Sequence, residues 1–181
     1  MKILVINPGG TSTKIAVFED EKELFKENIT HTGEDLKGFP HVFDQFGYRK
    51  DIILETLKKA GFEIRTFAAV AGRGGLMNPI PGGTYTVNSR MVEDLRGAIH
   101  GEHPSNLGAV LAKEIGDEIG ASSFVVDPVS VDELMPKARI SGISDLERPS
   151  WFHALNHKAV ARWTAERIGK KYEDCNLIIA H

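Results

Sequence analysis

The chain is poor in cysteine, in long hydrophobic runs and in excess charge. Cys175 is the only cysteine among 181 residues, so no disulfide can form within the chain and nothing indicates an oxidising compartment. No apolar run reaches the roughly 18 residues that a membrane-spanning helix requires. The chain begins with a strand-like segment and not with a charged targeting segment. We therefore expect a cytoplasmic protein with no membrane or targeting segment.

The modest charge also restricts the partners. A formal net charge of −3 removes the usual electrostatic reason to expect nucleic acid or an anionic membrane. Apolar residues make up 41% of the chain, which is enough to bury a core, and the length predicts one domain or one domain of something larger. Basic residues are therefore expected to serve local ligands.

The N-terminal segment carries the most informative pattern. Apolar residues 3–6 and 15–18 flank a Pro-Gly-Gly turn, which predicts a buried β-hairpin. Its turn region holds the polar residues Asn7, Thr11, Ser12, Thr13 and Lys14. Two adjacent glycines leave the backbone N–H groups accessible to a large anion, so the turn is a candidate phosphate site. The alternative is an ordinary turn with a solvated lysine. A strand follows the turn, so it is neither a Walker A loop nor a dinucleotide fingerprint.

This hairpin carries a family resemblance. Asn7-Pro8-Gly9 with Ser12, Thr13 and Lys14 resembles the first phosphate motif of the acetate and butyrate kinases, although the family usually has Ser where this chain has Gly10. Those kinases share a superfamily with sugar kinases, heat-shock ATPases and actin. The resemblance implies an α/β fold of the ribonuclease H-like (actin-like ATPase) class. Its mixed sheet opens with an antiparallel meander, to which residues 24–30 add the third strand, and helices cover both faces.

The rest of the chain alternates helices and strands, as in βαβ crossovers. One helix is predicted near residues 42–46, and the spacing of apolar residues predicts four more. The first of these contains Ile53, Leu57 and Ala60 and is ended by Gly61, and the second contains Val92, Leu95 and Ile99. The third contains Leu107, Val110, Leu111 and Ile115 and is capped by Ser105 or Asn106, and the fourth contains Leu155, Ala159 and Trp163. Strands are predicted at residues 66–70, 124–126 and 176–181.

A second glycine-rich loop, residues 71–83, follows a predicted strand. Ligands gather at the carboxyl edge of open α/β sheets, so Arg73 is placed to meet one. A solvated arginine in a long surface loop is the alternative. The run G-G-L-x-x-P-I-P-G-G-x-Y resembles butyrate kinases more closely than acetate kinases.

Three further candidates lie in motifs downstream. His103 precedes a helix N-terminus, where a neutral hydrogen-bond donor is favoured, and its run H-P-S-N-L-G resembles the family's substrate-side histidine. Asp127 follows a buried strand, where it can orient a histidine or act merely as a turn residue. His153 opens a run F-H-x-x-x-H that looks like the family's active-site motif. Zinc binding by His153 and His157 is set aside, because no third ligand is evident.

The resemblance implies transfer of a phosphoryl group from ATP, with Mg²⁺, to a short-chain carboxylate such as butyrate or a branched analogue. In that reading Arg73, Asp127 and His153 are catalytic, and Arg73 and His103 bind the carboxylate. The ATP phosphates fall to Asn7, Ser12 and Lys14, with Asn7 also in the magnesium shell. A carboxylate is already ionised at pH 7, so the site needs charge neutralisation and positioning and no general base.

The resemblance also bears on domain organisation. Residues 1–181 are expected to form one N-terminal, substrate-side domain, without the C-terminal nucleotide-binding domain and inactive alone. Homodimerisation or association with a second domain is expected. Two alternatives stay open: a noncatalytic anion-binding or protein-interaction module that keeps the fold, and a fragment of a sugar kinase or heat-shock ATPase, which the Arg73 and His153 loops disfavour.

Overall fold

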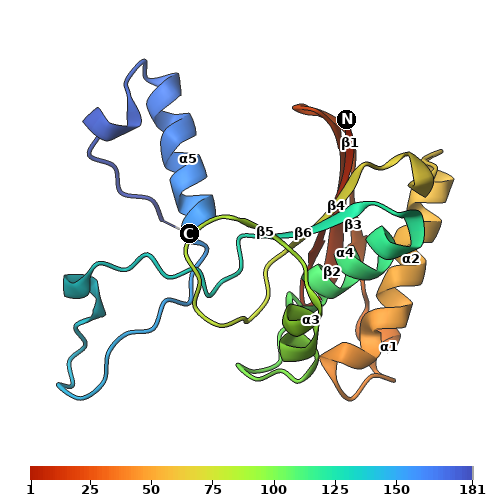
Figure 1. Ribbon diagram of the computed structural model, residues 1–181, viewed down its shortest axis with the longest axis horizontal. Helices are drawn as coiled ribbons and strands as arrows, with labels where there is room; N and C mark the ends of the chain where they lie inside the picture. The colour runs from red at the N-terminus through yellow and green to blue at the C-terminus, as the bar shows by residue number, and fades with distance from the viewer. Residues whose placement is uncertain (181) are drawn as a thin grey trace.

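The computed structural model describes residues 1–180, which contain one mixed six-stranded sheet (Figure 1). The antiparallel meander consists of β1 (Lys2–Pro8), β2 (Ser12–Glu19) and β3 (Lys22–Thr30). Strands β4 (Ala69–Arg73) and β6 (Ser122–Val126) run parallel to β1, and β5 (Thr84–Thr86) pairs antiparallel with β6. The order across the sheet is β3-β2-β1-β4-β6-β5. The predicted mixed sheet with an opening meander is confirmed.

Alternating apolar residues give the sheet one fully buried face. Leu4 pairs with Val17 and Ile6 with Ile15, and all four side chains are buried. Because successive side chains in a strand point to opposite faces, this register places them on the same side. Val70 of β4 belongs to the same core cluster.

Three helices cover that face. Helices α2 (Phe46–Lys59) and α4 (Asn106–Ile119) pack on it through Ile53, Leu57, Leu107, Leu111 and Ile115, and α3 (Ser89–Arg96) packs against α4. The remaining short helices are α1 (Gly33–Leu36), η1 (Val42–Gln45), η2 (Ile64–Thr66), η3 (Pro136–Arg139) and η4 (Tyr172–Asp174). Within residues 1–180, none of the helices is both long and apolar enough to cross a membrane.

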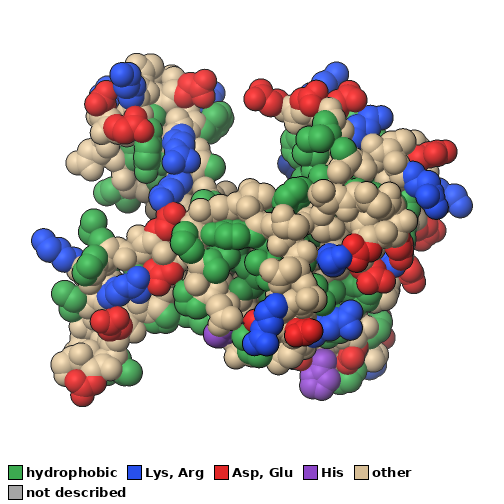
Figure 2. Space-filling model, in the orientation of Figure 1, with side chains coloured by type: hydrophobic (Ala, Val, Ile, Leu, Met, Phe, Trp, Pro, Cys, Tyr) green, Lys and Arg blue, Asp and Glu red, His purple; other side chains and the backbone are tan. Residues whose placement is uncertain are grey.

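Helix α5 (Ala154–Arg167) lies on the other side of the sheet. Its residues Leu155 and Ala159 face Val5 and Ala71 across a cleft of about 370 Å³. Figure 2 shows an open notch between α5 and the body of the molecule. The expectation of helices on both faces of the sheet is confirmed, with the second face only partly covered.

The predicted apolar stripe of α5 is not its buried side. Trp163 is exposed, whereas Ala154, Ala161 and Ala165 are buried. The small alanine side chains let this side of the helix pack closely, so the Leu155, Ala159 and Trp163 stripe faces outward or into the cleft.

Several predicted boundaries shift in the structure. The strand predicted at residues 66–70 is β4, three residues later, so Arg73 is its last residue and not part of the loop. Helix α3 ends before Ile99, which is exposed. The helix predicted near residues 42–46 is the 3₁₀ turn η1, which leads into α2. Strand β5 and helix α1 were not predicted.

The predicted strand at residues 176–181 is wrong for its described part. Residues 176–180 contain no strand, and Ile178 is 97% exposed. A strand needs a neighbour for its backbone hydrogen bonds, and no described segment pairs with this one. His181 lies outside the described residues.

Candidate active site

The parallel strands end at one edge of the sheet, which brings three predicted site residues together. Ile6 pairs with Gly72 and Arg73 with Val126, so the ends of β1, β4 and β6 lie in line. Asn7, Arg73 and Asp127 each stand at or just beyond such an end. This is the edge at which ligands bind in open α/β sheets.

A cavity of about 200 Å³ lies at this edge. Six of the seven predicted site residues line it, and the seventh, Asp127, contacts two of the six. The lining residues are Asn7, Pro8, Gly9, Ser12, Lys14, Arg73, Gly74, His103, Ser105 and His153. The structure therefore brings the whole predicted set together from five separate parts of the chain.

Asp127 joins Arg73 to His153 at the floor of the site. Its Oδ2 lies 3.3 Å from Arg73 Nη2 and 3.2 Å from His153 Nδ1. Burial alone would raise the pKa of Asp127, but the contacts with His153 and Arg73 outweigh it and hold the pKa below its usual value. The carboxylate is therefore ionised at neutral pH and fixes the orientation of both partners.

His103 is held by Ser105. The Ser105 N–H donates to His103 Nδ1 at 3.2 Å, and the Ser105 hydroxyl lies 2.7 Å from the same nitrogen. An accepting Nδ1 requires the proton to sit on Nε2. Burial first, and then the charge of His153, lower the pKa of His103. The ring is therefore a neutral Nε2–H donor beside the cavity, in agreement with the predicted character. Ser105 does not cap α4 with its side chain, as the sequence suggested it could.

Close backbone packing positions His103 next to Arg73. A Cβ on Gly72 would lie 2.0 Å from the Gly108 carbonyl oxygen, and a Cβ on Gly108 would lie 2.4 Å from that of Arg73. The first turn of α4 consequently rests directly on the end of β4. Gly74 follows with a φ of +91° and contacts Ser105.

The loop between β1 and β2 has the features of an anion site. Its turn is closed by a 2.7 Å hydrogen bond from Gly9 N–H to the Ser12 carbonyl. Among the described residues, no partner accepts from the N–H groups of Gly10 and Thr11. Lys14 lines the cavity and has no ion-pair partner within residues 1–180. Free amides and a free ammonium together favour an anion.

A buried polar network beneath this loop was not predicted. Arg49 of α2 is fully buried, and its guanidinium donates to Gln45 Oε1 at 2.9 and 3.0 Å and to Thr13 Oγ1 at 2.8 Å. Longer contacts of 3.4 and 3.3 Å reach the carbonyl oxygens of Gly10 and Ser12. The sequence did offer a signal, because Arg49 precedes Ile53 and Leu57 on the same apolar stripe.

The network continues to His31 and Tyr48. Thr13 Oγ1 lies 2.8 Å from His31 Nε2, and His31 Nδ1 lies 3.0 Å from the Tyr48 hydroxyl. Because Thr13 accepts from Arg49, its own proton is free to go to His31 Nε2. Burial and the charge of Arg49 lower the pKa of His31, so this ring is neutral as well.

The donor set for a metal ion is small. No group of three His, Cys, Asp or Glu side chains within residues 1–180 is arranged to hold one. However, Oδ1 of Asp127 is buried and accepts no hydrogen bond from a described residue. A buried carboxylate oxygen without a described donor, at the same sheet edge as Asn7, suits a magnesium ion that keeps most of its water.

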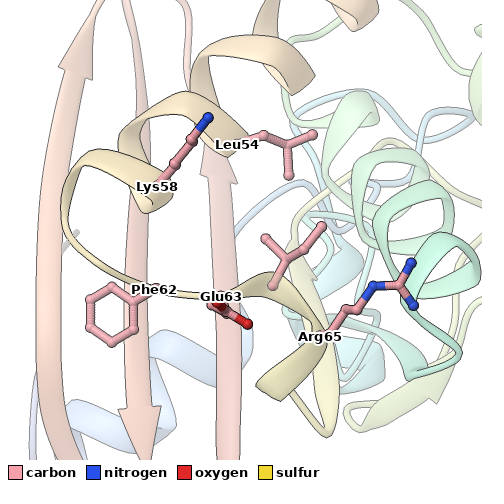
Figure 3. A pocket seen from close by; sticks show the side chains of 6 residues that line it. Leu54, Lys58, Phe62, Glu63 and Arg65 are labelled. Carbon is pink, nitrogen blue, oxygen red and sulfur yellow. The ribbon is translucent and has the colours of Figure 1, made fainter.

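A larger hollow lies away from this site. It measures about 360 Å³ and is formed by the end of α2 and the segment after it (Figure 3). Its lining is Leu54, Lys58, Phe62, Glu63, Ile64 and Arg65, none of them a predicted site residue. This hollow supplies control positions for the experiments below.

Comparison with known proteins agrees with the motif analysis. No family model matches the chain. A probable butyrate kinase of Clostridium botulinum (strain Eklund 17B) is 54% identical over 180 residues, which is 99% of this chain. Butyrate kinase 1 of Clostridium acetobutylicum is 52% identical over the same length. The chain is homologous to the butyrate kinases. It spans about half the length of these butyrate kinases, 51% in both cases.

Solved structures support the fold of this butyrate kinase relative. Acetate kinase of Porphyromonas gingivalis superposes with a TM-score of 0.63 at 14% identity, covering 94% of this chain and 50% of the other. A propionate kinase of Francisella tularensis gives a TM-score of 0.61 at 12% identity, with coverage of 93% and 49%. The expected fold class is thereby confirmed.

Proposed function

We propose that this chain is the carboxylate- and phosphate-binding side of a butyrate kinase, which transfers a phosphoryl group from ATP to butyrate or a branched short-chain analogue. One observation carries the proposal: Arg73, Asp127 and His153 form a linked group at the edge of a cavity that Lys14, Ser12 and His103 also line. The residue set offers cations and neutral donors to two anions, which is what this transfer requires.

Each side chain has a role in the proposed reaction. Butyrate arrives ionised, so its oxygen attacks without a base. Arg73 donates to the carboxylate or to the equatorial phosphoryl oxygens, because its planar fork can form two hydrogen bonds to an anion. His103 donates a hydrogen bond from Nε2 to the acyl substrate, and His153 donates a hydrogen bond to the phosphoryl group during its transfer. Asp127 keeps Arg73 and His153 in place.

In this proposal the loop between β1 and β2 binds the phosphates of ATP. Lys14, Ser12 and the N–H groups of Gly10 and Thr11 bind them. Asn7 and the buried Oδ1 of Asp127 would hold Mg²⁺, and the ion would neutralise phosphate charge. ATP as donor and a single reduced cysteine fit a cytoplasmic enzyme.

The proposal also covers domain organisation. Residues 1–181 are one substrate-side domain, and a second domain closes over the nucleotide in the complete enzyme. Closure excludes water and aligns donor and acceptor, a positioning effect worth roughly 7 to 11 kcal/mol of barrier. The open notch beside α5 and the partly covered second face of the sheet support association with a further domain or with a second copy.

A chimaera tests the proposal. This chain replaces the matching 180 residues of the Clostridium botulinum relative, which is 54% identical, and butyryl phosphate is trapped as the hydroxamate. We expect ATP-dependent product from the chimaera and none from the 181-residue chain alone. Arg73→Lys should lower kcat/KM by about a thousandfold or more, since an arginine on a transferring phosphoryl group is worth roughly 10³ to 10⁵.

Arg65→Lys is the matched control, because it makes the same arginine-to-lysine change at the remote hollow of Figure 3. It should leave turnover unchanged. Equal activity of the Arg73→Lys and parent chimaeras would remove Arg73 from the reaction. Product formation by the intact 181-residue chain would refute the proposal that the reaction requires a second domain. A folded chimaera that binds butyrate but never forms product would favour the noncatalytic anion-binding alternative.

A further inference from the structure

Arg49 is the most deeply buried charged side chain in the described part of the protein, and it lies under the candidate phosphate loop. Its exposed fraction is 0%. A buried charge is normally paired, because removal from water costs several kcal/mol. Among residues 1–180, however, no carboxylate lies within ion-pair distance of Arg49. Its partners are one amide oxygen, one hydroxyl and two carbonyl oxygens.

These partners connect Arg49 to both ends of the loop. Nη2 contacts the Gly10 carbonyl and Nη1 contacts the Ser12 carbonyl, while Thr13 Oγ1 ties the start of β2 to the same guanidinium. The C=O and N–H of one peptide unit point in opposite directions, so the Gly10 carbonyl turned toward Arg49 directs the Thr11 N–H to the opposite side. Among the described residues, neither the Thr11 N–H nor the Gly10 N–H has a protein acceptor. The guanidinium is itself fixed by Gln45 one turn earlier in sequence.

Gly9, Ser12 and Lys14 of the same hairpin line the cavity that the candidate site residues share. A bound phosphate there would be the counter-charge that Arg49 lacks. Electrostatic attraction through buried protein is less screened by salt than attraction between exposed charges. Arg49 thus combines two effects on one ligand, the shape of the amide cradle and an uncompensated positive charge behind it.

We propose that Arg49 is a positioning residue for phosphate binding: from beneath the Gly9–Ser12 loop it fixes the amide cradle and supplies the buried positive charge that the bound phosphate chain neutralises. The inference rests on the proposed function, in which this loop holds the phosphates of ATP. Arg49 touches no substrate and acts through Gly10, Ser12 and Thr13.

The test uses inorganic pyrophosphate as the probe and the 181-residue chain as the protein. Amide ¹H–¹⁵N spectra follow Gly10 and Thr11 during the titration, and thermal unfolding is recorded with and without pyrophosphate. We expect saturable shifts of these amides in the parent chain. Arg49→Met should weaken binding by about tenfold to a hundredfold, the range for hydrogen bonds to charged groups. It should also abolish most of the rise in unfolding temperature that pyrophosphate produces.

Two further variants separate positioning from general stability. Arg49→Lys keeps the charge and loses the fork, so binding should be intermediate between parent and Arg49→Met. Lys50→Met is the matched control: Lys50 is the next residue of α2 and pairs with Glu114 and Glu118 of α4. It removes one cation from the same helix and should leave pyrophosphate affinity within about twofold of the parent, as expected for a partly exposed ion pair.

The outcomes separate a failure of the Arg49 inference from a failure of the proposed phosphate loop. Parent binding at Gly10 with equal affinity in Arg49→Met overturns this inference and leaves the phosphate loop standing. Absence of any loop perturbation in the parent overturns both. If Arg49→Met fails to fold, Arg49→Lys and Thr13→Val decide, because Thr13→Val keeps the guanidinium and deletes the hydroxyl contacts with Arg49 and His31. Unchanged pyrophosphate affinity in both of these variants would refute the positioning role.

Discussion

The substitution Asp127→Asn tests whether the carboxylate at the floor of the site holds the cluster together. Asn has nearly the same shape and tolerates the left-handed backbone of this position, where φ is 51°. The change therefore removes the charge with little strain. Arg73 then loses its only ion-pair partner within residues 1–180, at 3.3 Å, and the His153 ring loses a carboxylate at 3.2 Å.

The magnitude follows from geometry and burial. At an effective dielectric constant of about 20, unit charges 3.3 Å apart attract by about 5 kcal/mol. Desolvation offsets much of this, since Asp127 is 8% and Arg73 30% exposed. A net loss of about 2 kcal/mol in the free energy of unfolding at pH 7 is expected, within the range for hydrogen bonds to charged groups.

The pH dependence gives the sharper test. The pKa of Asp127 in the folded chain lies below its ordinary value of 3.8. Its stabilisation is therefore fully present above that ordinary value and is lost as the pH falls through the folded-state pKa. The difference between parent and Asp127→Asn should accordingly be largest at neutral pH and shrink in strongly acidic buffer. Urea unfolding at a series of pH values measures it.

The control for this series is Asp117→Asn. Asp117 pairs with Lys113 on the surface of α4 and should contribute less than about 0.5 kcal/mol at any pH. A loss for Asp127→Asn that is the same at pH 7 and in acid would mean that packing, and not charge, explains the effect. No loss at pH 7 would refute the link between Asp127, Arg73 and His153.

Two other predictions concern the scaffold of the site. Gly72→Ala should lower the free energy of unfolding by about 2 kcal/mol or more, because its Cβ would overlap the Gly108 carbonyl, whereas Gly47→Ala, in open space within α2, should stabilise by about 0.5 to 1 kcal/mol. Urea unfolding separates them, and equal stabilities would contradict the packing argument. Imidazole ¹⁵N spectra of His103 should show the Nε2–H form with a pKa below 6.5. Ser105→Ala loses the hydroxyl contact and keeps the backbone N–H donor to Nδ1, so the Nε2–H form should still predominate. A ring already mixed in the parent would contradict the assignment.

The site residues could be predicted from sequence because they follow recognisable strands. Apolar runs mark β1, β4 and β6, and parallel strands end at one edge of the sheet. Asn7, Arg73 and Asp127 therefore had to lie near one another once those strands were recognised. Their individual roles in the reaction remain predictions.

Orientation could not be predicted in the same way. The hydrogen bond from Ser105 to His103 selects a tautomer, and Ser105 had an equally good local reading as a helix cap. The contact between Arg49 and Thr13 joins residues 36 positions apart, which no local spacing indicates. A lone arginine on the apolar stripe of Ile53 and Leu57 was the available signal, because a buried cation requires polar partners from another element.

The strand errors have two different causes. For β4, a glycine within the run suggested that the strand had already ended, whereas Gly72 stays in the sheet because Gly108 of α4 packs against it. For residues 176–180, the apolar composition was read as a strand although composition cannot say whether a pairing neighbour exists. Periodicity reports which side chains prefer burial, and pairing depends on the rest of the fold.

Backbone conformation at the sheet edge explains why the candidate cluster can be compact. Gly74 and Gly75 have φ of +91° and +110°, and Asp127 has φ of +51°. The chain thus changes direction immediately after β4 and after β6, so that Arg73 and Asp127 stay at the edge within 3.3 Å of one another. A left-handed aspartate costs of order 1 kcal/mol, and such strain persists only where the surroundings hold it. Here the contacts with Arg73 and His153 supply that restraint, which couples the strained backbone directly to the charges that the proposed reaction needs.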